Sequence, residues 1–354
     1  MLYQTENQHG GDVYGGGITL DFSANTNPLG TPPGVLEAVR RGLPQLHRYP
    51  DPYCRQLVQA IAGHEQVPAS YILCGNGAAD LIYTYCAALR PRTAVELAPT
   101  FGEYGAGLAQ VGCRVERYFL HQAQNFDLDE RFLSFLEEKK PEVVFLCNPN
   151  NPTGRLIPLP LLEQILQYCA AQGARLFLDE CFLDLTEDGV SAKSLLAAHP
   201  ELLILKAFTK SYGMAGIRLG YCLCADNALL RDMAAASPPW NVSSLAQSAG
   251  VAALEEGDFL QRTLSLVRTE RRWLTDNLTA LGFWVCPSHA NYLLFCGPLG
   301  LREGLLQQGI AIRGCGNYQG LDEGWYRIAV RPHGENETLI TAIRQFCKEK
   351  ALWQ

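Results

Sequence analysis

Three features that would place this chain in a membrane, on nucleic acid or in a secretory route are missing from its 354 residues. No apolar run approaches the roughly 18 residues that a membrane-spanning helix needs, so we expect no membrane span. Acidic residues outnumber basic ones by 36 to 29 and no arginine-rich run is present, so nucleic acid is not an expected partner. The N-terminal stretch MLYQTENQHGGDVYGGG has no basic region followed by an apolar core, so we expect no secretory leader.

A complete set of metal ligands is missing as well, although the chain has 13 cysteines. Most of them lie inside apolar runs, as Cys147 does in VVFLCN, which is typical of small buried side chains in a reducing compartment. Cys222 and Cys224 form a close pair, but no cysteine or histidine nearby in the sequence completes a zinc site. We therefore expect no metal and a cytoplasmic location.

Strand-like apolar runs alternate with amphipathic segments through the middle of the chain, which predicts an α/β fold with a mostly parallel sheet covered by helices. In the C-terminal third, a long helical pattern over 245–280 precedes ANYLLFC, GIAIRG and WYRIAVRP, which predicts a smaller α+β domain. We expect an arm and part of the small domain over 1–40, a large domain over 41–260 and the small domain over 261–354. The strand-like runs occupy 71–74, 94–99, 143–148, 175–180 and 202–208.

Three of these runs end in polar residues at a regular spacing. Asn148 opens the turn NPNNPTG, Asp179 ends the next run, and Lys210 follows the third, with 31 residues between each pair of positions. One βαβ unit takes roughly 30 residues, so the three strand ends are expected at the same edge of one sheet. Ligands of open α/β sheets bind beyond that edge. We therefore expect an amide, a carboxylate and an amine to converge on one small molecule.

This set of groups indicates pyridoxal phosphate. A lysine amine forms a Schiff base with its aldehyde, and a carboxylate opposite the pyridine nitrogen keeps the ring protonated as an electron sink. An amide can donate a hydrogen bond to the ring oxygen. Each residue also has an ordinary structural interpretation, with Asp179 as a helix cap and NPNNPTG as a plain turn, and it is their shared spacing that favours the cofactor site.

The cofactor phosphate needs a cradle, and the sequence offers one at YILCGNGAADLIY. Here a strand, a glycine turn and a helix start follow one another over 75–79, and a helix N-terminus binds phosphate well. Thr209 and Arg218 would add a hydroxyl and a guanidinium. A plain strand–helix turn remains the alternative. GNGAAD lacks the third glycine of the dinucleotide fingerprint, which excludes a nicotinamide dehydrogenase on this pattern.

These motifs resemble the fold-type I pyridoxal-phosphate enzymes of the class I/II aminotransferase group over nearly the whole chain. The resemblance rests on FSANTNPLG, RYPDP, GNGAAD, NPNNPTG, LDECF, TKSYGMAGIRLGY, ANYLLF and YRIAVRP. It implies the fold of that group, with a large mostly parallel sheet between helices and a smaller α+β domain. It also implies pyridoxal 5'-phosphate as the cofactor.

The resemblance also implies individual roles. Lys210 would be the Schiff-base lysine, Asp179 the partner of the ring nitrogen and Asn151 the partner of the ring oxygen, while Phe101 would stack on the ring. Tyr49 would reach the cofactor phosphate of a neighbouring subunit, which implies a homodimer with shared active sites. The remaining cofactor ligands would be Gly77, Ala78, Thr209 and Arg218. The substrate would meet His9, Gly10, Asn25, Asn151, Arg313 and Arg327, with Arg327 on the α-carboxylate.

Two positions depart from the family pattern. A tyrosine often stands three residues after the ring aspartate, but this chain has Phe182, so Asn151 would act without that phenol. A serine often stands three residues before the lysine, but this chain has Ala207, so one contact to the cofactor phosphate would be missing. Neither change removes the groups that the chemistry needs.

Two branches of the group remain in competition: threonine-phosphate decarboxylases of cobalamin synthesis and histidinol-phosphate aminotransferases. HGGD, DFSANTNPLG and IRGCGNYQGLD resemble the decarboxylases more closely. The expected reaction is therefore decarboxylation of O-phospho-L-threonine, with O-phospho-L-serine a further candidate substrate. A regulatory sensor with this fold would carry a DNA-binding domain ahead of it, and DFSANTNPLG already begins at residue 21, which leaves too few residues for one.

Overall fold

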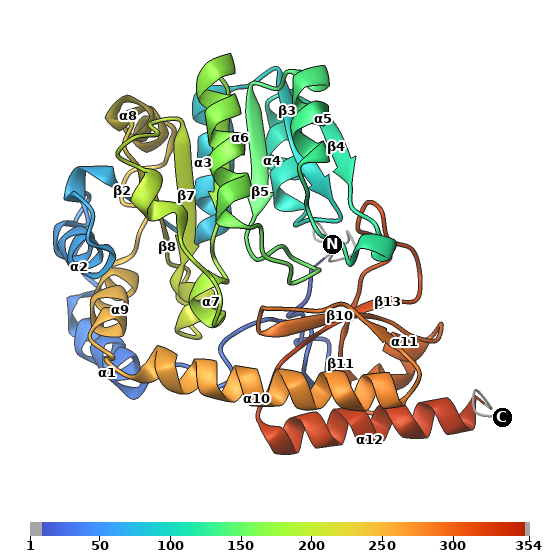
Figure 1. Ribbon diagram of the computed structural model, residues 1–354. Coiled ribbons are helices and arrows are strands. Elements are labelled where there is room, and N and C mark those ends of the chain that lie inside the picture. Colours follow the sequence, from blue (N-terminus) through green and yellow to red (C-terminus); the bar gives the residue numbers. More distant parts are fainter. Residues whose placement is uncertain (1–8, 351–354) are drawn as a thin grey trace.

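Seven strands form the largest sheet of the computed structural model, which describes residues 9–350 (Figure 1). Their order is β2-β8-β7-β6-β5-β3-β4, and all neighbours are parallel except β8, which runs antiparallel to both β2 and β7. The central strands are buried almost throughout, as expected for a sheet covered on both faces. The strands are β2 (Ile72–Gly75), β3 (Thr93–Ala98), β4 (Arg114–Phe119), β5 (Val143–Cys147), β6 (Arg175–Asp179), β7 (Leu202–Ala207) and β8 (Gly220–Cys224).

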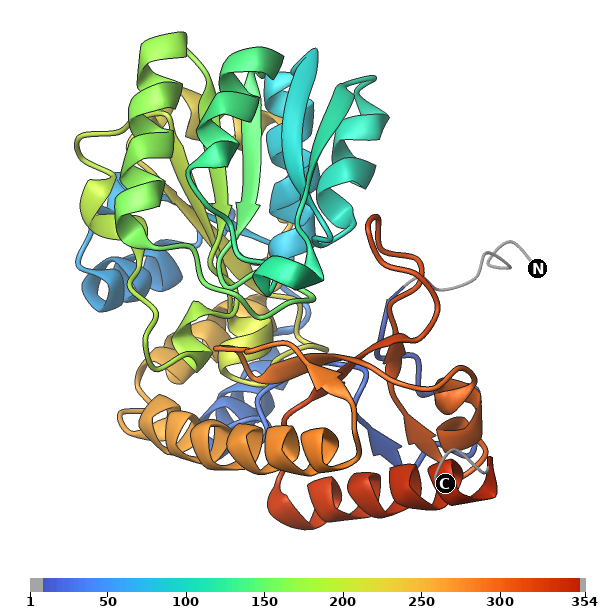
Figure 2. The ribbon, with the colours of Figure 1, turned by 45° about the vertical axis from the view of Figure 1, so that its right-hand side comes forward.

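Helices cover both faces of this sheet. α3, α4 and α8 pack together on one face, while α5 and α6 lie on the other (Figures 1 and 2). In α6, Leu162, Ile165, Leu166 and Cys169 recur at the spacing of one helix face, and all four are buried. The helices are α3 (Ala78–Leu89), α4 (Glu103–Gln110), α5 (Arg131–Lys139), α6 (Leu159–Gln172), α7 (Phe208–Ser211) and α8 (Asn227–Ala236).

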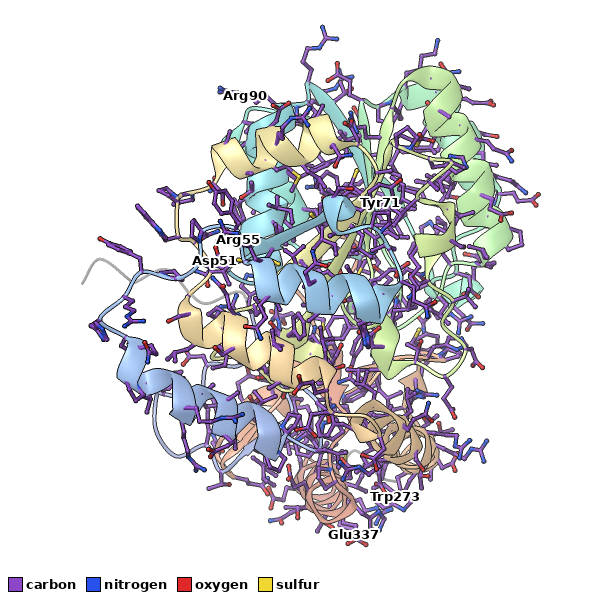
Figure 3. The ribbon with its side chains drawn as sticks, turned by 90° about the vertical axis from the view of Figure 1, so that its left-hand side faces the viewer. Asp51, Arg55, Tyr71, Arg90, Trp273 and Glu337 are labelled. Carbon is purple, nitrogen blue, oxygen red and sulfur yellow. The ribbon has the colours of Figure 1, made fainter. Side chains whose placement is uncertain are left out.

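A third group of helices, α1 (Pro33–Gly42), α2 (Arg55–Glu65) and α9 (Ser244–Leu254), packs beside the β2 edge of the sheet. Figure 3 views this side and shows Asp51 and Arg55 at the start of α2, where they form an ion pair of 2.7 Å. The Pro/Gly-rich stretch over 26–34 runs into the first turn of α1 and links the N-terminal arm to that helix.

The smaller lobe is built around an antiparallel sheet of order β12-β13-β10-β9. Two long helices, α10 and α12, run along it, and Figure 3 labels Trp273 and Glu337 on them. None of the helices within residues 9–350 is long and apolar enough to cross a membrane. The elements are α10 (Phe259–Ala280), β9 (Trp284–Val285), β10 (Tyr292–Cys296), α11 (Leu301–Leu306), β12 (Arg313–Gly314), β13 (Trp325–Ala329) and α12 (His333–Glu349).

The N-terminal arm joins this smaller lobe. β1 (Leu20–Asp21) pairs in parallel with β11 (Ile310–Ala311), and the N–H of Ala329 donates to the carbonyl of Phe22 at 2.8 Å. Phe22 is fully buried in the core of the lobe with Leu274 and Ile343. The arm therefore ends against the strands that carry Arg313 and Arg327.

Two expectations about local structure were wrong. The helical pattern over 245–280 is two helices, α9 and α10, separated at 255–258, where Gly257 and Asp258 are weak helix formers and α10 leaves the α1–α2 group for the smaller lobe. The edge strand β4 was missing from the strand-like runs expected from the sequence, because its charged residues hid the strand pattern.

Candidate active site

The carboxyl ends of the three strands that precede Asn148, Asp179 and Lys210 lie at the same edge of the sheet, as predicted. β5, β6 and β7 are adjacent and parallel, and a cavity of about 380 Å³ opens beyond their carboxyl ends. The expectation that Asn148 itself meets the ligand was wrong, because its side chain accepts a hydrogen bond of 2.8 Å from the N–H of Ile157 and stabilises the turn. The amide that lines the cavity is that of Asn151. The predicted residues on the cavity wall are His9, Gly10, Asn25, Ala78, Phe101, Asn151, Asp179, Thr209, Lys210, Arg218, Arg313 and Arg327.

Lys210 lies on α7, the single helical turn that follows β7. Burial lowers the pKa of its amine to about 8, and the charges of Arg327 and Arg218 act in the same direction. Its Nζ lies 5.5 Å from the centre of the Phe182 ring, the position where related enzymes often have a tyrosine. A lysine in this setting can act as a nucleophile near neutral pH, because about a tenth of its amine is already unprotonated at pH 7, far more than for an ordinary lysine.

Asp179 ends β6 and is buried in the cavity wall. Its Oδ2 accepts a hydrogen bond of 2.6 Å from the hydroxyl of Tyr104, and its Oδ1 accepts one of 2.9 Å from the N–H of Cys181. Burial raises the pKa of this carboxyl, while the hydrogen bonds and Lys210 oppose the rise. The carboxylate is thus held in a fixed orientation at the base of the site.

The turn before α3 has the shape of a phosphate cradle. Gly77 has a φ of +88°, and a Cβ added there would come within 2.6 Å of Nη2 of Arg218, so a side chain at this position would collide with the guanidinium. Ala78 begins α3 and lines the cavity together with Thr209 and Arg218, while Gly77 stands just behind them. The N-terminus of α3, a hydroxyl and a guanidinium therefore meet at one point.

Buried polar groups without partners mark the other side of the cavity. Both side-chain atoms of Asn25 and Nε of Arg327 are buried and make no hydrogen bond among the residues described. Arg327, on β13, donates through Nη1 to Oδ1 of Asn151 and through Nη2 to the carbonyl of Ser23 at 2.8 Å. Unsatisfied buried groups cost about 1–3 kcal/mol each, so their presence here is the mark of a site that a polar ligand completes.

Arg313 and Tyr49 occupy different surroundings. Arg313 lies on the cavity wall, with Nη2 donating to Oδ1 of Asn317 at 2.7 Å and the guanidinium 5.3 Å from the ring centre of Tyr318. Tyr49 lies outside the cavity of its own chain, where its side chain is 80% exposed and stacks on Trp240 at 4.6 Å.

Sequence analysis missed several residues of the wall. Glu103 lines the cavity and contacts His9, while the fully buried Tyr104 holds Asp179 from behind the wall; both lie at the start of α4, just after Phe101. The three-residue interval between Phe101 and Tyr104 is a helical spacing that could have indicated the second aromatic residue. The other missed residues are Ser23, Cys147, Cys181 and Tyr318.

The model of the aminotransferase class I and II family matches residues 18–346. The chain belongs to that family. Its cofactor is accordingly pyridoxal phosphate, and three observations show that this family member retains a place for it: the lysine with a lowered pKa, the buried aspartate, and the cradle in which Gly77 leaves room for Arg218. In this family member Lys210 would hold the aldehyde carbon, Asp179 the ring nitrogen, and the start of α3 the phosphate.

Curated relatives in the family include both branches. The chain is 41% identical to the threonine-phosphate decarboxylase of Salmonella typhimurium, with 92% of this chain and 90% of that protein covered. It is 33% identical to the histidinol-phosphate aminotransferase of a Geobacillus species, with coverages of 96% and 93%. Among solved structures, the histidinol-phosphate aminotransferase of Clostridium acetobutylicum matches with a TM-score of 0.87 at 28% identity, over 93% of this chain and 99% of that one.

Proposed function

We propose that this chain decarboxylates O-phospho-L-threonine to CO2 and 1-amino-2-propanol O-phosphate, for the nucleotide loop of cobalamin. The observation that carries the proposal is the cation set of the cavity. Arg313, Arg327 and His9 line the same space as Lys210 and Asp179, so the site matches an amine that bears both a carboxylate and a phosphate. The 41% identity to a threonine-phosphate decarboxylase, against 33% to a histidinol-phosphate aminotransferase, supports this branch.

The residues divide the work between binding and proton transfer. The cofactor supplies an electron sink for the bond that breaks at Cα. Arg327 binds the substrate carboxylate, and its contacts to Asn151 and Ser23 fix the direction of its guanidinium. Arg313, His9 and Asn25 bind the phosphate, and that binding energy holds the substrate in the orientation for loss of CO2. Lys210, with a pKa of about 8, delivers a proton to Cα as the carboxylate leaves.

The test is release of carboxyl carbon as CO2. Purified holoenzyme is incubated with carboxyl-labelled O-phospho-L-threonine, and O-phospho-L-serine is run beside it because a single methyl group is worth only about 1–3 kcal/mol in a pocket. We expect labelled CO2 from the threonine ester and its loss in Lys210→Ala. No release, together with nitrogen exchange between histidinol phosphate and 2-oxoglutarate, would show that the chain is an aminotransferase.

The same proposal includes a homodimer in which Tyr49 of each subunit contacts the cofactor phosphate in the active site of the other subunit. Tyr49 lies outside its own cavity, and the neighbouring side chains of Leu43, Leu46, Tyr53 and Trp240 are also exposed large apolar groups. Such a cluster on one side of the molecule is typical of an association surface. A mixed dimer of one Tyr49→Ala chain and one Lys210→Ala chain should contain one complete site and about half the activity of the parent dimer, whereas inactive mixed dimers would contradict a shared site. The thirteen cysteines are all free thiols, which agrees with a reducing, cytoplasmic location.

A further inference from the structure

The arm reaches the cavity through a contact with α4. Nε2 of His9 lies 2.7 Å from Oε1 of Glu103, and the His9 ring centre lies 5.9 Å from that of Phe101. His9, Phe101 and Glu103 all line the cavity. The side chain of His9 is 48% exposed, so packing does not enclose the imidazole on all sides, and the contact with Glu103 fixes the position of its Nε2.

The second carboxylate oxygen of Glu103 is held by a hydrogen bond from α3. This oxygen, Oε2, accepts a hydrogen bond of 2.7 Å from the hydroxyl of Tyr83 on α3. The hydrogen bond from His9 lowers the pKa of Glu103, and that from Tyr83 adds to the effect, so the carboxyl is ionised at neutral pH. Burial and the nearby carboxylate raise the pKa of Tyr83 to about 12, so the phenol keeps the proton that it donates.

The backbone of the arm is fixed on the side of the smaller lobe. The N–H of Gly11 donates to Oγ of Ser23 at 2.8 Å, and a Cβ at Gly10 would come within 2.1 Å of the Ser23 carbonyl oxygen. The same carbonyl accepts the hydrogen bond from Arg327. The position of the arm is thus tied to that of the arginine, and His9 spans from the smaller lobe to α4 of the large sheet.

We propose that Glu103, fixed by Tyr83, is a positioning residue that orients His9 toward the substrate's phosphate and so sets the affinity of the site for it. The inference rests on the proposed function in taking a phosphate ester as the ligand that His9 meets. A carboxylate at hydrogen-bond distance fixes the plane and direction of an imidazole ring, as it does for metal-bound histidines. Without it, the half-exposed ring loses the contact that fixes its Nε2, and its alignment toward the anion is weakened.

The probe is inorganic phosphate, titrated calorimetrically into the holoenzyme so that the cofactor already occupies its own cradle. We expect Glu103→Gln to weaken phosphate binding about tenfold, the loss of one charge-assisted arrangement. His9→Ala should weaken it at least as much, and the double variant no more than His9→Ala alone, because both changes remove one interaction. Glu138→Gln, which changes the charge equally at an exposed surface glutamate, should bind like the parent.

Steady-state kinetics separate positioning from general damage. In Glu103→Gln we expect KM for the phosphorylated substrate to rise about tenfold with kcat within about twofold, and cofactor absorbance to be unchanged. If that variant does not fold, Tyr83→Phe keeps the ring and should weaken phosphate binding about threefold. Parent-like phosphate affinity in Glu103→Gln, with loss in His9→Ala, would overturn this inference alone. A holoenzyme that binds phosphate but releases no CO2 would overturn the proposed function alone.

Discussion

The hydroxyl of Tyr104 lies 2.6 Å from Oδ2 of Asp179 and donates a hydrogen bond to it. Tyr104 is fully buried and stacks on Phe145, with ring centres 5.5 Å apart, so the phenol cannot turn away. The N–H of Cys181 holds the other carboxylate oxygen. The acid that we expect to face the cofactor ring is therefore oriented from both sides, and Tyr104 was not among the residues expected from the sequence.

Replacing Tyr104 by phenylalanine should weaken cofactor binding. The ring packing remains, but one oxygen of a buried carboxylate loses its donor, which costs about 1 kcal/mol or about fivefold in cofactor affinity. Absorbance titration of the apoenzyme with pyridoxal phosphate measures the change. Tyr85→Phe is the matched control, because the buried Tyr85 hydroxyl has no hydrogen-bond partner among the residues described and its removal should leave the affinity unchanged. Equal affinities in Tyr104→Phe and the parent would contradict this role.

Capture of the cofactor by the apoenzyme should depend on pH through Lys210. Its pKa is lowered from 10.5 to about 8, so the reactive neutral amine forms as pH rises through about 8. The second-order capture rate should rise over that range and level off well below pH 10. Arg327→Gln removes one of the charges that lower the pKa and should move the profile to higher pH, while Arg302→Gln, on the surface, should not. A profile that still rises steeply at pH 10 would refute the lowered pKa.

Gly77→Ala should impair the phosphate cradle more than it impairs folding. A methyl group there would collide with the Arg218 guanidinium and would also have to accept a φ of +88°. We expect cofactor affinity to fall by at least tenfold, the loss of a charge-assisted contact. Gly112→Ala is the control, because its φ of +73° carries the same backbone strain with nothing within 4 Å of the added Cβ. A cofactor affinity in Gly77→Ala as high as in Gly112→Ala would contradict the role of this turn in binding the phosphate.

Lys206→Met should destabilise the fold without touching the cavity. The buried ammonium lies 2.8 Å from Oδ1 of Asp184 and 3.0 Å from Oε1 of Glu65, and its removal leaves the buried Glu65 and the partly exposed Asp184 without that cation. We expect a loss of about 3–5 kcal/mol in the free energy of unfolding, measured by urea denaturation of the apoenzyme. Lys193→Met removes a partner of Glu65 that is 36% exposed, and the loss should be about 1 kcal/mol or less. A small effect at both positions would argue against a tightly coupled buried network.

The spacing of Asn148, Asp179 and Lys210 was enough to predict one edge of one sheet, because the βαβ unit has a characteristic length and its strands run parallel. The type of site followed from the residues at those ends. A role for Tyr104 could have been inferred too, since it stands three residues after Phe101, at the start of α4.

Other features could not be predicted from a single chain read locally. The contact between His9 and Glu103 joins an arm to a helix 94 positions away, and it depends on how the smaller lobe packs against the large sheet. The break between α9 and α10 is likewise decided by which lobe each helix packs on, because one glycine alone does not end a helix.

The orientation of β8 determines how one short segment can serve the site twice. Because β8 runs against β7, residue 207 at the end of one faces residue 220 at the beginning of the other, and the same holds for 75 at the end of β2. The dozen residues that join β7 to β8 therefore stay at the edge of the sheet where the cavity lies. Lys210 comes near the beginning of this segment and Arg218 near its end, and both line the cavity. In an all-parallel sheet the chain would have had to cross to the opposite edge of the sheet before the next strand. Lys210 and Arg218 would then have needed two separate segments of the chain to reach the same cavity.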